Sequence, residues 1–324
     1  MNYGIRKFIK EAVLINPHDE KCEPLVSVII PTKNRCSLLE RAIKSVLVQN
    51  YDNIEIIIID EASDDATSEI AYRYKQRFKK FKYMRNDKSY GGAKARNIGI
   101  SFASGRYIAF LDDDDEWLPT KITKQVNKLE NDYSVGLVFC WFLRRYNNGI
   151  IERVKQTNQV DFLRLLWTNI GSCSFCVVRS DLVKKIGGFD ETLLSCQDWD
   201  LWLRLSNITK IYGIREYLVI YNDHSMHRIS TNEINRIRGY QAFYLKYSNS
   251  MTHLCRRYHL AFIYYLKFRF LEKQKINNLY KMFYYCPSQK IIFFILVIIK
   301  NILPKPILYL MIYLKNKGLN LTRL

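Results

Sequence analysis

The chain has 324 residues, 48% hydrophobic and 14% aromatic, and carries a formal net charge of +19. This apolar content supports one large domain, or one domain with a smaller appendage. The apolar stretch 12–15 is too short for the core of a secretory signal peptide, which argues against a disulfide-bonded secreted protein, and we expect the eight cysteines to be reduced, cytosolic thiols.

The first half of the chain alternates short apolar runs with amphipathic segments. The apolar runs predict strands and the segments between them predict helices. The expected strands are 25–30, 54–59, 82–85 and 106–111, and the expected helices are 37–48, 64–78 and 92–103. Repeated strand–helix units of this kind predict a mostly parallel sheet with helices on both faces.

Polar residues follow three of these strands, at 32–34, 60–61 and 112–115. The carboxyl ends of parallel strands lie along one edge of the sheet, where proteins of this class bind their ligands. We therefore expect three clusters that are far apart in the sequence to meet in one crevice.

The last of these clusters is a run of four aspartates, Asp112–Asp115, which lies between an apolar strand and the turn 116–119. Adjacent carboxylates repel one another, and burying them at a strand end is unfavourable unless a cation compensates. Oxygen ligands of this type favour Mg²⁺ or Mn²⁺. The alternative is an acidic turn that is simply solvated.

Residues 135–230 mix strand-like and helical patterns. Residues 135–141 and 171–178 predict strands, 187–190 predict a turn, and 201–205 predict a helix.

Most of the positive charge lies at the end of the chain. Residues 231–324 contain 16 Lys and Arg against only Glu233 and Glu272, so +14 of the total +19 lies here. The same region is predicted to be helical and is rich in Tyr and Phe. A basic aromatic region binds either nucleic acid or an anionic membrane surface.

Residues 290–315 decide between these two partners. Their apolar runs are interrupted at Lys300 and at 304–306, whereas a transmembrane helix needs about 20 consecutive apolar residues. We predict two short helices, broken near Pro304, that lie in the membrane interface with their lysines toward anionic headgroups. The alternative is a helical tail that packs on the domain. We expect no nucleic-acid binding, because the aromatic residues accompany aliphatic runs rather than a base-stacking motif.

Six blocks of the sequence stand out, in this order: 26–35, 56–65, 91–100, 107–119, 187–190 and 197–204. Together they resemble the family 2 glycosyltransferases, whose fold is GT-A, and the last two blocks match the acceptor-side segment of that family. One block alone would be weak, but six in the same order make a specific signal. The resemblance implies an α/β GT-A fold, a Rossmann-like mostly parallel sheet with flanking helices, over 24–230. Residues 1–23 would be a lead segment and 231–324 a basic helical extension.

The resemblance implies a nucleotide-binding crevice. Asp60 would accept a hydrogen bond from the base, Glu61 would contact the ribose, and Arg96 would lie near the nucleotide. The alternative for Asp60 is a residue that caps a helix or shapes the turn. The remaining residues that would line the base and ribose are Pro31, Thr32, Asn34 and Arg35.

The resemblance also places the family's Asp-x-Asp motif on Asp112 and Asp114. Asp114 would ligate Mn²⁺ or Mg²⁺ directly, and Asp112 and Asp113 would lie against the nucleotide-sugar. His224 would supply a second ligand or a diphosphate contact, unless it is a structural histidine. The cation would neutralise the departing diphosphate, which is typically the largest contribution to catalysis of this kind.

The position of the general base in the family matches Asp198. Gln197 stands where the family commonly has Glu, so no neighbouring carboxylate repels Asp198 there. Asp200 is the rival base, but on a helix it would point away from Asp198, and we expect it to cap the helix or to pair with Arg204.

The resemblance therefore implies an inverting transfer of one hexose or N-acetylhexosamine from a UDP-sugar. We find no Gln-x-x-Arg-Trp segment of the kind that processive synthases carry. The expected acceptor is a hydroxyl of a polyprenyl-diphosphate-linked saccharide in O-antigen or capsule synthesis, at the inner face of the cytoplasmic membrane. The alternatives are a catalytically silent homologue that acts as a membrane or assembly partner, and a nucleotidyltransferase that uses the same acidic cluster.

Overall fold

The computed structural model describes residues 23–223, 233–271 and 274–286. Ten strands form one sheet in the order β3-β2-β1-β4-β9-β6-β10-β5, with β7 beside β6 and β8 beside β10. The strands are β1 (Val26–Thr32), β2 (Ile54–Asp60), β3 (Phe81–Arg85), β4 (Tyr107–Phe110), β5 (Glu116–Trp117), β6 (Val135–Tyr146), β7 (Ile151–Val154), β8 (Gln159–Val160), β9 (Val177–Arg179) and β10 (Lys210–Asp223).

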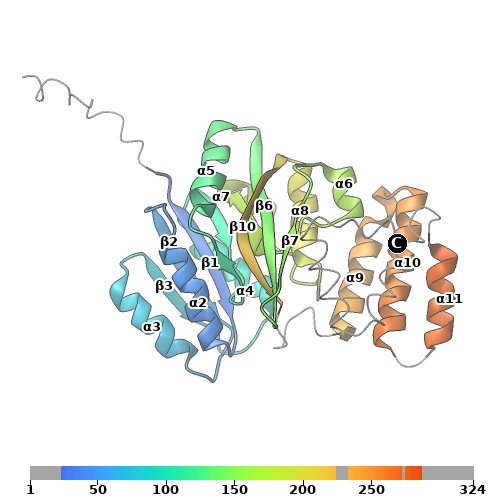
Figure 1. Cartoon of the computed structure of the whole chain (residues 1–324), viewed down its shortest axis with the longest axis horizontal. Coiled ribbons are helices and arrows are strands. Elements are labelled where there is room, and N and C mark those ends of the chain that lie inside the picture. The colour runs from blue at the N-terminus through green and yellow to red at the C-terminus, as the bar shows by residue number, and fades with distance from the viewer. Residues whose placement is uncertain (1–22, 224–232, 272–273, 287–324) are drawn as a thin grey trace, which may run out of the picture.

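Helices cover this sheet, and further helices pack beside it on one side (Figure 1). They are α2 (Cys36–Leu47), α3 (Thr67–Arg77), α4 (Gly92–Phe102), α5 (Lys121–Asn131), α6 (Phe162–Trp167), α7 (Ser180–Lys185), α8 (Gln197–Ser206), α9 (Glu233–Tyr247), α10 (His253–Phe270) and α11 (Lys275–Tyr285). Two 3₁₀ turns, η1 (Cys173–Phe175) and η3 (Ser248–Ser250), complete the described elements.

The long strands run in one direction. β1 pairs in parallel with β2 and β4, β2 with β3, and β6 with β10, while β5, β7, β8 and β9 pair antiparallel with their neighbours. Consecutive residues of β1 and β2, Val28–Ile30 and Ile56–Ile59, are almost completely buried. Because successive side chains point to opposite faces, both faces of these strands are covered. The expected mostly parallel α/β sheet is confirmed.

One close approach places α4 directly on β1. A Cβ at Gly99 would lie 2.3 Å from the Cγ2 atom of Ile29, so only glycine fits at this position of the helix. Arg96 lies three residues earlier in the same helix, toward its N-terminus. The packing of Gly99 therefore brings Arg96 to the edge of the sheet where β1 and β4 end.

The prediction of one strand over 171–178 is wrong in its first part. Ser172 caps a 3₁₀ turn by accepting a hydrogen bond from the backbone N–H of Ser174, and the strand β9 begins only at Val177. The apolar pattern of this stretch could not reveal the turn, because side-chain capping competes locally with strand formation. The expected turn at 116–119 also contains the short strand β5, which pairs with β10.

The described part of the basic C-terminal region packs on the domain. Ile237 and Phe243 of α9 and Leu266 of α10 belong to the same buried apolar cluster as the sheet residues. Figure 1 shows α9, α10 and α11 in a row beside α8. Among the described helices, none is long and apolar enough to cross a membrane. The interfacial helices predicted within 290–315 lie outside the described residues.

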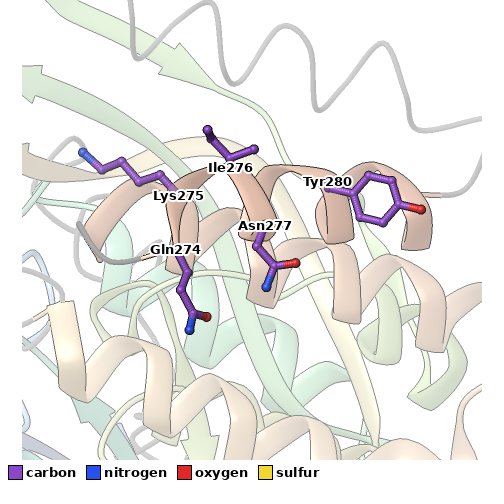
Figure 2. Close-up of a pocket in the computed structure, with 5 residues that line it drawn as sticks. All are labelled: Gln274, Lys275, Ile276, Asn277 and Tyr280. Atoms are coloured by element: carbon purple, nitrogen blue, oxygen red, sulfur yellow. The ribbon is translucent and has the colours of Figure 1, made fainter.

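A hollow of about 700 Å³ lies on α11. Figure 2 shows the side chains that line it, Gln274, Lys275, Ile276, Asn277 and Tyr280. Lys275 and Ile276 point to one side of the helix, and Gln274 and Asn277 point to the other (Figure 2). These side chains do not converge on one point, and α9 and α10 stand between α11 and α8 in Figure 1. The hollow is therefore not a candidate for the active site.

A buried histidine between α9, α10 and α6 makes the stability of the protein depend on pH. His259 is completely buried between the Tyr240 hydroxyl and the Leu166 carbonyl oxygen, at 2.7 and 2.6 Å. Burial lowers the pKa of His259 to about 4. The unfolded chain takes up this proton below about pH 6.5, so the stabilisation present above that pH is lost as the pH falls toward 4.

We expect the lowered pKa of His259 to decrease the free energy of unfolding by about 2 kcal/mol when the pH falls from 7.5 to 5. Urea unfolding of the wild type and of His259→Gln at both pH values measures the effect. The variant should lose less stability on acidification than the wild type, and an equal loss in both proteins would contradict the prediction.

Candidate active site at the carboxyl ends of the strands

The three polar clusters predicted from the sequence meet at one edge of the sheet. The hydroxyl of Thr32, at the end of β1, donates to Asp113 Oδ2 over 2.8 Å. The backbone N–H of Glu61, after β2, donates to the carbonyl oxygen of Thr32 over 2.9 Å. The ends of β1, β2 and β4 are thus joined by direct hydrogen bonds.

The first two aspartates of the acidic run each have a positively charged partner. Arg96 Nη2 donates to Asp112 Oδ1 over 2.5 Å, and Arg35 Nη1 donates to Asp113 Oδ1 over 2.8 Å. Ser172, in the turn before η1, donates to the other oxygen of Asp112 over 2.8 Å. These separate partners reduce the repulsion between neighbouring carboxylates.

Asp113 is almost completely buried, and both of its carboxylate oxygens accept hydrogen bonds. Only 4% of the residue is exposed, and burial raises its pKa to about 6, although Arg35 acts in the opposite direction. Its two oxygens already accept hydrogen bonds from Thr32 and Arg35.

Three other carboxylates of the run form a candidate metal site. Asp112, Asp114 and Asp115 each offer one oxygen, and these oxygens all lie within 4.8 Å of one another. Asp114 and Asp115 are 6% and 0% exposed. Buried carboxylates this close together fit a small divalent cation, because Mg²⁺ and Mn²⁺ favour oxygen ligands and would neutralise the repulsion.

Asp115 was not among the ligands predicted from the sequence, because the Asp-x-Asp motif ends at Asp114. Its Oδ1 atom accepts a hydrogen bond from the backbone N–H of Asn222 over 3.3 Å, and Asn222 Nδ2 donates to the carbonyl oxygen of Asp114 over 2.8 Å. The end of β10 therefore lies against the acidic run. His224, the second predicted ligand, follows Asn222 by two residues but lies outside the described residues.

The predicted base contact, Asp60, is engaged within the chain. It is fully buried and accepts hydrogen bonds from the backbone N–H of Ser63 over 2.9 Å and from the Tyr83 hydroxyl over 2.7 Å. These contacts match the alternative interpretation, in which Asp60 shapes the turn after β2.

Glu61 has a similar internal role. Its Oε2 atom accepts hydrogen bonds from the backbone N–H groups of Tyr90 and Gly91, both over 2.6 Å, and so holds the loop that leads into α4. Asn34 joins the neighbouring loops, because its side-chain oxygen accepts from the backbone N–H of Asp64 over 2.8 Å. Pro31 lies within β1, opposite Ile59.

Arg96 lies between the metal-site candidates and the acceptor-side segment. The residue is 8% exposed, its guanidinium lies 5.6 Å from the ring centroid of Phe189, and its Nε atom has no hydrogen-bond partner in the described part of the chain. Burial opposes its charge, but Asp112 outweighs this and raises the pKa of Arg96. The crevice therefore contains a permanent positive charge.

Asp198 lies in the first turn of α8 and borders the same crevice. Burial raises its pKa to about 6, while Arg96 lowers it and Asp112 raises it through their charges. Arg204 of the same helix donates to the carbonyl oxygen of Gly188 over 2.6 Å, and the ring of the next residue, Phe189, lies against the Arg96 guanidinium, so α8 and Arg96 meet at the turn 187–190. A carboxylate with a pKa near 6 is suited to act as a general base around neutral pH.

Asp200, the rival base, is fully buried and occupied. It accepts a hydrogen bond from Arg204 Nε over 2.8 Å, as the sequence predicted, and another from the Tyr247 hydroxyl over 2.7 Å. Lys246 Nζ lies 2.6 Å from Asp200 Oδ1, the oxygen that also accepts the hydrogen bond from Tyr247. Lys246 and Tyr247 belong to α9, and nothing in the sequence pattern indicated that they reach α8.

Comparisons with known proteins agree with this geometry. The sequence model described as "Glycosyl transferase family 2" matches residues 27–187. An uncharacterized glycosyltransferase of Rickettsia typhi is 32% identical over 238 residues, which span 71% of this chain and 73% of that protein. A UDP-Glc:alpha-D-GlcNAc-diphosphoundecaprenol beta-1,3-glucosyltransferase of Escherichia coli is 32% identical, over 56% of this chain and 70% of its own.

Two solved structures share the fold. Staphylococcus aureus TarS 1–349 in complex with UDP-GlcNAc superposes with a TM-score of 0.63 at 18% identity, and the match covers 82% of each chain. A mannosyltransferase of Pyrobaculum calidifontis in complex with GDP-Man and Mn²⁺ gives a TM-score of 0.53 at 19% identity, over 87% of this chain and 80% of the other. At such low identity, these likenesses concern the fold alone.

Proposed function

The chain belongs to glycosyl transferase family 2 and has the GT-A fold, and from this premise we propose that it transfers one hexose or N-acetylhexosamine from a UDP-sugar, with inversion, to a saccharide acceptor. The observation that carries the proposal is the meeting of Asp198, Arg96 and the acidic run at the carboxyl ends of the strands. This combination provides a base and a set of charges around one crevice.

In this proposal, Asp198 takes the proton of an acceptor hydroxyl. The hydroxyl oxygen then bonds to the anomeric carbon from the face opposite the diphosphate, and the bond between that carbon and the diphosphate oxygen breaks, so that UDP leaves and the anomeric configuration inverts. Arg96 and Arg35 supply fixed positive charge near the departing group. Asp112, Asp114 and Asp115 would hold Mn²⁺ or Mg²⁺, which supplies charge neutralisation of the diphosphate when bound.

The donor and acceptor are inferred from the names of relatives. A structural neighbour binds UDP-GlcNAc, and a curated relative uses UDP-Glc and a diphosphoundecaprenol-linked acceptor. A putative colanic acid biosynthesis glycosyl transferase of Escherichia coli, WcaA, is 29% identical over 76% of this chain and 90% of its own. We therefore propose a role in surface polysaccharide biosynthesis with a polyprenyl-diphosphate-linked acceptor.

Such an acceptor resides in the membrane, and we propose that the protein works at the cytoplasmic face of the cytoplasmic membrane. The net charge of +14 on residues 231–324 supports attraction to an anionic surface. A catalytically silent homologue is not favoured, because the acidic run and the general-base candidate are both present. A nucleotidyltransferase is disfavoured by the family of the chain.

The direct test is UDP release from a panel of UDP-sugars with Mn²⁺, with and without a lipid-diphosphate-linked N-acetylhexosamine. Acceptor-dependent release of UDP with one donor would support the proposal. Binding of UDP without turnover of any donor, on a panel of such acceptors, would count against it and favour the silent homologue. Pyrophosphate release from a nucleoside triphosphate would favour the nucleotidyltransferase.

The pKa of Asp198 predicts the pH dependence of this activity. Asp198 acts as a base only when ionised, and burial raises its pKa to about 6. We therefore expect kcat/KM to rise about tenfold per pH unit below about pH 6 and to become constant above about pH 7. Initial rates measured between pH 5 and pH 8 at fixed ionic strength test this, and a kcat/KM that stays constant down to pH 5 would show that the ionisation of Asp198 does not control the rate.

A further inference from the structure

The C-terminal helix α9 contacts the first turn of α8, which carries Asp198. Lys246 Nζ lies 2.6 Å from Asp200 Oδ1 and 2.6 Å from Asp190 Oδ2. Asp200 is fully buried two residues after Asp198, and Asp190 ends the turn 187–190. One lysine thus bridges the two segments that the sequence assigned to the acceptor side.

A second contact of α9 fixes the residues that precede α8. A Cβ at Gly239 would lie 2.3 Å from the backbone nitrogen of Ser195, so α9 and this loop are in backbone contact. The Ser195 hydroxyl also donates to the carbonyl oxygen of Arg236 over 3.2 Å. Cys196, the next residue, has a φ of 61°, and this left-handed conformation needs support from its surroundings.

A third contact involves the residue next to Asp198. The ring of Trp199 lies 4.5 Å from that of Phe243 in α9, and its indole N–H donates to the carbonyl oxygen of Leu165 over 2.6 Å. Asp198 is therefore flanked on both sides by residues that α9 contacts, Ser195 before it and Trp199 and Asp200 after it.

The turn 187–190 connects α9 and α8 with Arg96. The backbone N–H of Phe189 donates to Asn97 Oδ1 over 2.7 Å, and the Phe189 ring lies beneath the Arg96 guanidinium. Arg204 of α8 donates to the carbonyl oxygen of Gly188 over 2.6 Å. Lys246 therefore touches, through Asp190 and Asp200, both the segment that holds Arg96 and the segment that holds Asp198.

We propose that Lys246 is a positioning residue, which fixes the first turn of α8 against the turn 187–190 so that Asp198 faces the acceptor side of the crevice. The proposal deepens the proposed function and rests on it for the role of Asp198. It also makes α9, which lies beyond the matched family segment 27–187, part of the catalytic unit rather than only a membrane-directed extension.

Removal of the lysine should disturb position rather than folding. In Lys246→Met, Asp200 keeps Arg204 and Tyr247, and Asp190 keeps the hydroxyl of Thr192. Misplacement of a reacting group by about 1 Å costs up to about 100-fold in rate. We expect kcat to fall about 10- to 100-fold, while KM for the donor and the Kd for UDP change less than about twofold, because the nucleotide side is not touched.

The matched control is Lys124→Met. Lys124 of α5 forms an ion pair with Glu216 of β10, and its side chain is 38% exposed, against 36% for Lys246. Both variants lose one ion-pairing lysine of similar exposure, but only Lys246 contacts α8. Lys246→Arg keeps the charge and should restore kcat to within about threefold, and Gly239→Ala should disturb residues 195–196 without changing any charge.

Hydrogen exchange of the protein without substrate gives a readout that does not depend on turnover. Faster exchange in Lys246→Met confined to 186–200, with Lys124→Met unchanged there, supports the proposal. Equal exchange in both variants, or a kcat of Lys246→Met within twofold of wild type, overturns it. Absence of turnover in the wild-type protein would instead contradict the proposed function, and the exchange comparison would still decide whether Lys246 holds these segments.

Discussion

Asp198→Asn is expected to lower kcat by about 10³-fold, since a positioned general base contributes about 10² to 10⁴. The substitution preserves the shape of the side chain and removes its ability to accept the proton. Asparagine also removes a carboxylate whose charge is unfavourable at this partly buried position. The thermal midpoint should therefore not fall, and the Kd for UDP should stay within about threefold of wild type, which calorimetry measures alongside initial rates.

Two aspartates provide controls for this substitution. Asp132 lies before β6 at the opposite edge of the sheet and pairs with Lys128 over 2.9 Å, so Asp132→Asn should leave kcat unchanged. Asp200→Asn removes a charge that Arg204 and Lys246 require, so its main effect should be a lower unfolding midpoint. A loss of kcat in Asp200→Asn at unchanged stability, together with an active Asp198→Asn, would make Asp200 the base.

The periodicity of the sequence predicted the elements that build the crevice. The strands that end at Thr32, Asp60 and Phe110 lie where their apolar runs end, because parallel strands buried on both faces have continuous apolar sequence. Once these strands are parallel, the polar residues after them must lie along one edge. The position of the crevice therefore follows from local patterns alone.

The partners of the crevice residues do not follow from local patterns. Asp60 accepts hydrogen bonds from Tyr83, and Asp115 accepts one from Asn222, which is 107 positions away. Such contacts depend on how strands and loops cross in space, and no period in the sequence encodes them. The same limit explains why the contacts of Asp60 and Glu61 with neighbouring loops were not predicted, and their contacts with the nucleotide stay a prediction.

The C-terminal region shows a second limit of reasoning from charge. Counted along the sequence, Lys246 is one of many basic residues in an aromatic region, a composition typical of membrane-surface segments. In the structure, it bridges Asp190 and the fully buried Asp200 where α9 meets α8. Net charge predicts the long-range field of a region, but it does not distinguish lysines without a partner from lysines that pair with a buried carboxylate.

Asp114→Asn is expected to abolish metal-dependent activity. Asp114 is a candidate ligand together with Asp112 and Asp115, and stabilisation of the departing charge by a bound cation contributes several kcal/mol. A loss of about 4 kcal/mol corresponds to about 10³-fold in kcat. Chelation of the wild-type protein should cause a similar loss, and added Mn²⁺ should restore the wild type but not the variant.

Direct measurement of Mn²⁺ affinity separates the two possible sets of ligands. Asp115→Asn should weaken Mn²⁺ binding by about 100-fold or more if the three carboxylates that converge in the structure hold the cation. Asp113→Asn is the matched control from the same run, because Asp113 is not one of the three converging carboxylates and pairs with Thr32 and with Arg35, which also lies 3.4 Å from Asp114. Its Mn²⁺ affinity should stay within a few-fold of wild type. Electron paramagnetic resonance of free Mn²⁺ gives both affinities without turnover. Wild-type affinity in Asp115→Asn, combined with loss in His224→Ala, would return the site to the set predicted from the sequence, Asp114 and His224.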